Sequence, residues 1–299
     1  SRTKREKAAT KDRRGQPNDM VYELAPENSV DGSTFNAGVI LKPTEAVQIY
    51  GKYSRGWRAP SLAESMVSPL AANNFSSWFP PGTTFVPANP EKAENYEVGI
   101  NFSDVGRVTG DDVLGLKIAY FDNRYEDYIA GISFPRFTSA DSAKFRGFEV
   151  SYSHDFDWIY TRLGLTRYLQ ASVCGLVTAG YRDPTCRDIT HGDHISGLYV
   201  PPETKADLTL GLRLFDRKLQ LGATVSYVDG AMGYLDNRYV DIDYAVLDVF
   251  ASYDFENDLR LDLSATNLSD QFYFDAGTPS TAAMPAPGRT FRAMLTKQF

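Results

Sequence analysis

The chain has 299 residues, of which 42% are hydrophobic and 23% are charged, so it is long enough to bury a sizeable core. Its 31 basic and 38 acidic residues give a net charge of -7, which argues against a general nucleic-acid binder. The sequence contains no run of about 18 apolar residues, and this excludes a helical membrane span. A membrane β-barrel is not excluded, because its strands alternate apolar and polar residues and average out in hydropathy.

Apolar and polar residues alternate along most of the chain from residue 34 onward, which is typical of half-buried β-strands. Segment 208–214 is the clearest example, since every second residue is leucine and polar or small residues lie between. This alternation predicts strands with one apolar and one polar face. It places Leu212 and Leu221 on the apolar face and Gly211 and Gly222 on the polar face.

Eleven strands of about 9–11 residues, the length that a tilted membrane strand needs, account for the pattern. We expect them to begin near residues 34, 46, 93, 114, 143, 158, 203, 219, 244, 258 and 287. Short and long connections then take turns, and the long ones, such as 58–92 and 169–202, hold many of the Pro, Gly, Ser and Asn residues. Outer-membrane barrels have short periplasmic turns and long extracellular loops, so the alternation predicts both class and orientation.

The expected fold is therefore all-β, a transmembrane antiparallel β-barrel. Bacterial single-chain barrels have even strand numbers, and an open sheet of eleven strands would leave unpaired edges in lipid. We expect residues 34–299 to form the C-terminal half of a barrel of about 22 strands, the size of the plugged outer-membrane transporters. Residues 1–33 are expected to be the remnant of an extracellular loop, and a plug domain is expected upstream of this chain.

Aromatic residues gather where the expected strands meet the expected loops. In the less specific interpretation they only reflect the preference of aromatic residues for strands. In the more specific interpretation they form the two interfacial girdles of a membrane barrel. The residues concerned are Trp57, Tyr125, Tyr128, Tyr168, Tyr199, Tyr239, Phe272 and Tyr273.

Several segments resemble TonB-dependent outer-membrane receptors. Residues 50–64 (YGKYSRGWRAPSLAE) look like a motif of that family, with Trp57 at a position that is usually Phe. Residues 89–99 (NPEKAENYEVG) are similar to the segment that follows it, in a shortened form. Three later segments, FRGFE at 145–149, NLSDQFY at 267–273 and PGRTF at 287–291, resemble the remaining landmarks in the correct order. Within the family, the chain is most similar to heme and hemophore receptors.

The resemblance implies import of heme or hemophore-delivered heme, powered by the TonB–ExbB–ExbD complex through the N-terminal part that this chain lacks. Bacterial outer membrane is the implied location. A ferric siderophore is the alternative cargo, and an adhesin-like barrel without transport is the alternative class. The family motif contributes Arg58, Ala59, Pro60, Asn89 and Pro90.

Heme iron usually takes an axial His or Tyr, and such receptors carry one in the loop between the two motif segments. Residues 61–88 contain neither, but they offer Trp78, Phe79 and Phe85 for stacking on a flat macrocycle. His191 and His194, in the later long connection, are the candidate axial ligands. The alternative for the three aromatic residues is a loop packed on itself. The alternative for the two histidines is a solvated pair without a ligand.

Cys174 and Cys186 lie in the same expected extracellular connection. Two cysteines in an oxidising compartment predict a disulfide, which would stabilise a loop of this size by about 3 kcal/mol. A metal site built from these thiols and the nearby histidines is the less favoured alternative, so no metal is predicted.

No enzyme motif occurs in the sequence: G-x-S-x-G, H-E-x-x-H, Walker A and G-x-G-x-x-G are all absent. The expected inward positions of Glu149, Asp248 and Asp262 are explained by a polar lumen. We therefore expect no catalytic residues, no resident cofactor and no enzymatic activity, with heme or a ferric chelate as transported ligand.

Overall fold

The structure is a computed structural model that describes residues 10–11, 17–18, 32–61, 64, 89–133, 136–178, 181–182, 184–189, 201–235, 238–255, 258–274 and 285–297. No helix in these ranges is long and apolar enough to cross a membrane. The described strands are antiparallel to their neighbours throughout.

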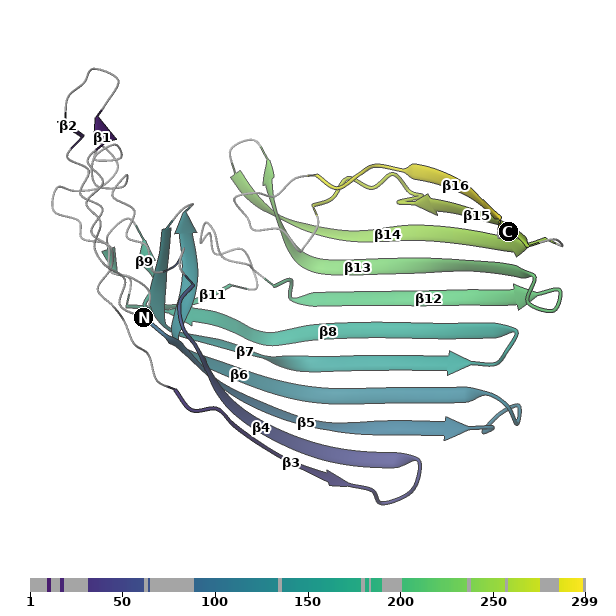
Figure 1. Ribbon diagram of the computed structural model, residues 1–299, viewed down its shortest axis with the longest axis horizontal. Helices are drawn as coiled ribbons and strands as arrows, with labels where there is room; N and C mark the ends of the chain where they lie inside the picture. Colours follow the sequence, from purple (N-terminus) through teal and green to yellow (C-terminus); the bar gives the residue numbers. More distant parts are fainter. Residues whose placement is uncertain are drawn as a thin grey trace.

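One large sheet dominates the described residues, and eleven of its strands follow one another as a simple meander (Figure 1). The eleven strands are β3 (Phe35–Leu41), β4 (Val47–Arg58), β5 (Glu91–Val105), β6 (Val113–Ser133), β7 (Arg136–Asp155), β8 (Ile159–Cys174), β12 (Thr204–Leu214), β13 (Leu219–Leu235), β14 (Arg238–Asp254), β15 (Leu259–Thr266) and β16 (Thr290–Lys297). A twelfth strand, β11 (Cys186–Asp188), pairs with the end of β8 on the edge opposite β7.

Four two-residue strands form two small separate sheets. They are β1 (Thr10–Lys11) with β2 (Pro17–Asn18), and β9 (Val177–Thr178) with β10 (Tyr181–Arg182). The prediction of eleven main strands is confirmed. Most begin within three residues of the expected position, and only β7 and β14 differ by more, since they begin earlier, at Arg136 and Arg238.

The connections between strands explain those early starts. The short connections, such as 156–158 and 215–218, lie at one end of the sheet, opposite the long connections 59–90 and 175–203 (Figure 1). Of the three other connections that we expected to be long, 267–289 is long, and two are replaced by strands, since β6 continues to Ser133 and β13 to Leu235. At these two places the expectation of a long loop is wrong, because the hairpins extend well beyond the length that a bilayer requires.

The two faces of the sheet have the polarity that the alternation predicts. Leu208 and Leu210 are 39% and 48% exposed on one face, and Leu212 pairs with Leu221 on that same face. Gly211 and Gly222 lie on the other face, where the rings of Tyr160 and Phe250 cover them. We call the first the apolar face and the second the polar face.

Gly147 in the FRGFE segment lies at a register shift between β7 and β8. A Cβ atom there would lie 2.2 Å from the backbone oxygen of Arg167 and 2.9 Å from the ring of Phe121. Only glycine permits this close approach of the two strands, so the resemblance at this segment has a structural cause.

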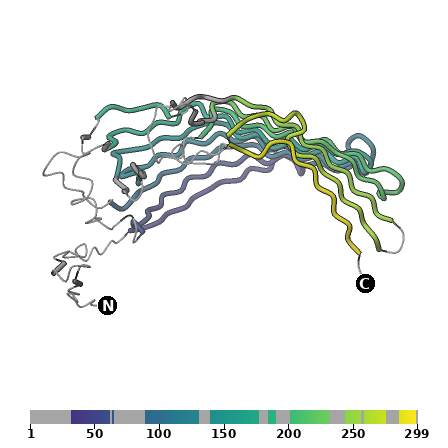
Figure 2. Tube along the Cα trace, turned by 90° about the horizontal axis from the view of Figure 1, so that it is seen from above, coloured from purple at the N-terminus to yellow at the C-terminus, as the bar shows by residue number. Residues whose placement is uncertain are grey.

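The sheet is strongly curved and does not close (Figure 2). Strands β3 and β16 form its two edges, and each pairs with one neighbour within the described residues. An arch with two free edges, rather than a closed cylinder, is the shape expected of part of a barrel.

Candidate functional site

The polar face of β4–β8 carries a network of charged and amide side chains. Tyr50 donates a hydrogen bond of 2.6 Å from its hydroxyl to Oε1 of Glu97. The ammonium of Lys117 lies 3.4 Å from the same carboxylate and 5.8 Å from the centre of the Tyr50 ring. On the same two strands, β4 and β5, Asn95 donates to Oγ of Ser54 over 3.3 Å. These contacts require water or polar ligands above them, so the polar face suits the lumen of a barrel.

A hollow of about 190 Å³ opens on this polar face between β4 and β8. Its polar lining comes mainly from Lys52, Asn95, Glu97, Asn123 and Glu149, with Phe121 and Tyr168 among its apolar members. The expectation that Glu149 faces inward is confirmed. Its carboxylate adds to the polar lining of the hollow.

An aromatic cluster lies next to the hollow, toward the long connections. It comprises Phe121, Tyr125, Tyr128, Phe145 and Tyr168, with ring centres 5.5–6.5 Å apart. It packs against a buried group of small aliphatic side chains that includes Ala130, Ala143, Ala171, Val173 and Ile189. The cluster supports the wall beneath the long connections.

This cluster corrects the girdle interpretation. Tyr125, Tyr128 and Tyr168 are on the polar face, so they do not contact lipid. Tyr273 is also inward, because its ring lies 4.4 Å from Tyr244 within the buried group around Val228. The side chains of Tyr199 and Tyr239 lie outside the described residues.

A different row of rings occupies the apolar face. Tyr53 lies 6.2 Å from Phe35 and 5.0 Å from Tyr96, and Tyr120 lies 5.2 Å from Phe148, all measured between ring centres. Phe35, Tyr96 and Phe148 are 57%, 40% and 42% exposed. The row has the position and chemistry of an interfacial girdle. We call it the outer aromatic row.

Arg58, from the family motif, clamps the two ends of connection 59–90. Its guanidinium lies 2.8 Å from Glu64, just after β4, and 3.6 Å from Glu91, the first residue of β5. Ser61 and Glu64 exchange hydrogen bonds as in a capping box. Burial opposes the charged form of Glu64, but the hydrogen bonds from Arg58 and Ser61 prevail and lower its pKa.

The second motif segment fixes the other end of the same connection. The backbone N–H of Asn89 donates to Oγ of Ser139, and its side-chain amide donates to Asp127 over 2.9 Å. Ala59 and Pro60 lead away from Arg58, and Pro90 leads into β5. Arg58 and Asn89 therefore hold the two ends of this connection in place.

Asn267 has a similar role in the NLSDQFY segment, where it is 2% exposed. Its side-chain amide donates to the carbonyl oxygens of Gln271 and Pro287, and its backbone N–H donates to Asp248. Asp270 in turn accepts a bond from the N–H of Arg289 in the PGRTF segment. The two late motif segments thus pin the connection between β15 and β16.

Cys174 and Cys186 form the predicted disulfide. Cys186 begins β11, and the register places it directly opposite Cys174 at the end of β8. The bond therefore ties the connection after β8 to the sheet. No group of three or more His, Cys, Asp or Glu side chains suited to a metal ion occurs among the described residues.

The predicted ligand-binding residues cannot be placed in this way. Trp78, Phe79, Phe85, His191 and His194 all lie outside the described residues. The described part of the site is thus the polar wall, the stems of the long connections and the disulfide.

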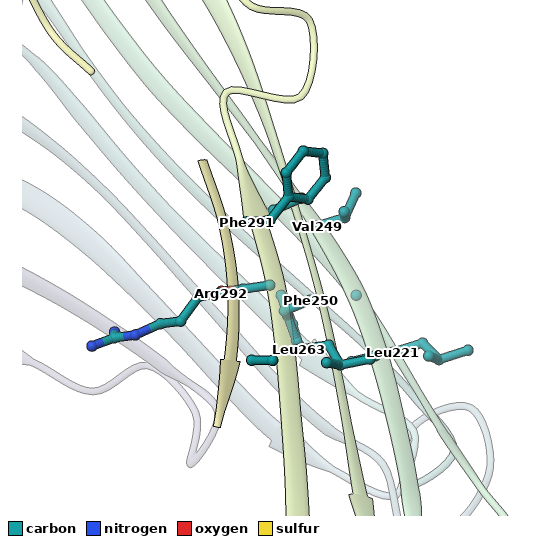
Figure 3. A pocket seen from close by; sticks show the side chains of 11 residues that line it. Leu221, Val249, Phe250, Leu263, Phe291 and Arg292 are labelled. Atoms are coloured by element: carbon teal, nitrogen blue, oxygen red, sulfur yellow. The ribbon is translucent and has the colours of Figure 1, made fainter. Parts of the chain in front are cut away.

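A second hollow, of about 660 Å³, lies elsewhere, over β13–β16 (Figure 3). Its lining is mainly apolar, with Leu221, Val249, Leu263 and Phe291 on the apolar face, while Arg292 points to the opposite side of the sheet. Such a groove suits contact with hydrocarbon chains, and it is not a candidate site for the transported ligand.

Comparison with known proteins defines the class. Residues 5–268 match the family described as TonB-dependent receptor-like β-barrel, and the chain belongs to this family. Members of this family are receptors and transporters, not enzymes.

Relatives of this chain include iron-compound receptors. It is 28% identical to the hemophilin receptor of Acinetobacter baumannii over 93% of this chain and 29% of that protein. It is 26% identical to a probable TonB-dependent siderophore receptor, PiuA, of the same species, over 91% of this chain and 34% of that protein. The chain therefore spans about a third of the length of these relatives.

The solved structures that it resembles include a double mutant of the Serratia marcescens hemophore receptor HasR in complex with its hemophore HasA and heme. That chain has a TM-score of 0.61 and 24% identity, over 87% of this chain and 38% of its own length. The likeness establishes the fold.

Proposed function

We propose that residues 34–299 form the C-terminal half of a barrel of about 22 strands in the bacterial outer membrane. Residues 1–33 would belong to an extracellular loop, and a plug domain would precede them. The two unpaired edges, β3 and β16, support the proposal. In lipid each unpaired backbone group would cost several kcal/mol, so further strands must cover both edges.

The proposed activity is import of an iron compound, with heme or hemophore-delivered heme as the first candidate. The observation that carries it is the polar wall of β4–β8, which ends in braced stems of long connections. Such a wall suits a lumen with a ligand-recognising mouth. TonB–ExbB–ExbD would supply the energy through the plug side of the receptor.

Two relatives point to different candidate cargoes. The hemophilin receptor supports heme, and the siderophore receptor PiuA supports a ferric siderophore as the second candidate. Both align with more than nine-tenths of this chain, so sequence similarity alone does not decide between them.

The deciding experiment is a titration of the complete receptor with hemin in detergent. A heme receptor should shift and sharpen the Soret band with saturation at one equivalent. A ferric siderophore should leave that region unchanged and quench tryptophan fluorescence if it is the cargo. Saturable quenching by the siderophore with no Soret response to hemin would overturn the heme assignment.

His191 and His194 are tested in the same assay. If this half supplies the axial ligand, replacing both with Ala should weaken hemin binding and change the Soret spectrum. An unchanged spectrum would show that this half does not ligate the iron. Growth on hemin in strains with and without TonB separates energised import from an adhesin-like role, since an adhesin would give no such growth in either strain.

A further inference from the structure

The apolar face changes character just beyond the outer aromatic row on β6–β8. Phe148 lies opposite Tyr120, and the next outward residue of β7, Arg146, lies opposite Asp122. Lys144 follows on the same face, opposite Arg124, and on β8 Arg167 lies opposite Phe148. We call Arg124, Lys144, Arg146 and Arg167 the cationic band.

The band has fewer carboxylates than cations. Asp122 lies 2.8 Å from Arg124 and 3.6 Å from Lys144, so these two cations share one carboxylate, and Glu94 lies opposite Arg124 on β5. Arg167 pairs with Glu203 and also donates to Oγ1 of Thr204. In the part of the chain that the structure describes, positive charge is therefore in excess on this patch of the face.

Arg146 adds an independent observation. Its Nε atom is buried and has no hydrogen-bond partner among the described residues. A buried donor without a partner is unfavourable, so an acceptor that reached this guanidinium would stabilise the side chain.

The neighbouring β4–β5 surface is different. Arg55 lies 3.8 Å from Glu94, and Lys92 lies 3.4 Å from Glu126, so each cation has its own carboxylate there. Positive charge is therefore not in excess on this neighbouring surface.

We propose that the cationic band binds the phosphate of a phosphorylated lipid in the outward-facing leaflet, with the acyl chains of that lipid lying on the outer aromatic row. A phosphate accepts hydrogen bonds from several Arg and Lys side chains at once. The rings of Tyr120 and Phe148, immediately below the band, offer apolar surface in the direction that the acyl chains must take. A free anion, which has no acyl chains, would make no apolar contact with these rings.

The inference rests on the proposed membrane orientation, but its test is independent of the cargo. The complete receptor, purified in detergent, is mixed with diphosphoryl lipid A, and bound lipid is counted by native mass spectrometry. The same acylated disaccharide without phosphates serves as the comparison lipid. Hemin binding is measured in parallel, so failure of the heme proposal and failure of the lipid proposal give different results.

The variant pair Lys144→Gln with Arg146→Gln should lower retention of the diphosphoryl lipid by about tenfold, since charge-assisted bonds are lost. Removal of the phosphates should lower retention by the wild type about equally and should have little further effect on the variant. The control pair, Arg55→Gln with Lys92→Gln, removes two charges from the same face and should change retention by less than about twofold.

Three outcomes would overturn the proposal. They are equal retention of the lipid without phosphates, an equal loss in the control pair, and complete displacement of the lipid by millimolar inorganic phosphate. The last outcome would identify a site for free anions. An unchanged cooperative melting temperature of both variant pairs verifies that neither result comes from unfolding.

Discussion

Single residues decide how closely the strands of this wall approach one another. Gly147 and Gly164 make this point as a pair, because both are glycines on neighbouring strands β7 and β8. A Cβ atom at Gly147 would lie 2.2 Å from a backbone oxygen, whereas at Gly164 it would meet nothing within 4 Å. The sequence shows two similar glycines, but only the first is required by packing.

Gly147→Ala should therefore destabilise the complete receptor by about 1–3 kcal/mol, the usual cost of overpacking. Gly164→Ala should be neutral or slightly stabilising, since alanine restricts the unfolded chain. The measurement is the midpoint of thermal or denaturant unfolding in detergent. Equal midpoints for the two variants would contradict the close approach at Gly147.

A buried carboxylate at the short-turn end makes stability depend on pH. Asp112 is fully buried in the connection between β5 and β6, and it accepts hydrogen bonds from Nε2 of His154 and from the backbone of Thr109 and Val108. The bond from His154, and then those from the backbone, hold the pKa of Asp112 well below its usual range.

Because the folded state lowers this pKa, the stabilisation is complete above the unfolded value of about 3.9 and is lost as pH falls toward the folded value. At pH 7 Asp112→Asn should lower the melting temperature, and the gap to the wild type should shrink below about pH 4. Melting curves at several pH values test this. A gap that stays constant down to pH 3 would show that the charge is not what stabilises the turn.

At the scale of the strands, alternation predicted position and facing well. It placed Leu212 and Leu221 on one face and Gly211 and Gly222 on the other, as the register confirms. It failed at the ends of β6 and β13, which continue to Ser133 and Leu235. Beyond the length that a bilayer requires, strand residues need not alternate strictly, so a long hairpin then resembles a loop in sequence.

Tyr125, Tyr128 and Tyr168 were assigned to the wrong face for a related reason. Tyr125 has the same alternation as Phe121, not Tyr120, so strict counting from the apolar face would have placed it inward. Asp127 has a positive φ of 52° and interrupts the alternation, which leaves Tyr128 beside Tyr125. Counting alternate residues places Tyr125 inward, but no sequence rule places Tyr128 beside it.

The sequence likewise predicted one part of the candidate site and not the other. The stem residues Arg58 and Asn89 and the disulfide were found from motifs and cysteine spacing. Their roles as clamps came only from the structure, because the partners Glu91, Asp127 and Ser139 are brought to them by strand pairing.

A single substitution by arginine can test which face of a strand lies toward lipid. Leu212→Arg should destabilise the receptor by about 2–4 kcal/mol if the residue lies near the bilayer midplane. Thr166→Arg should cost much less, because Thr166 lies on the polar face opposite Glu149 and Lys205. Unfolding in lipid bilayers is the measurement, and a larger loss at Thr166 would reverse the assignment of the two faces.

The whole arch has one property that no single strand explains, which is that neither edge is closed. Strand β3 pairs only with β4, and β16 pairs only with β15, within the described residues. Their 7 and 8 residues therefore present rows of backbone donors and acceptors without partners.

Residues 1–299 expressed alone should therefore not form a monomeric barrel, because lipid cannot satisfy these edges. They should aggregate, or close only by joining edges with further copies. The checks are heat-modifiable migration on gels and protease resistance in outer membranes, with the complete receptor as the positive control. A protease-resistant, heat-modifiable monomer would show that this chain closes its own sheet, and the half-barrel proposal would then be wrong. An oligomer with the same resistance would support it, since β3 of one copy would then pair with β16 of another.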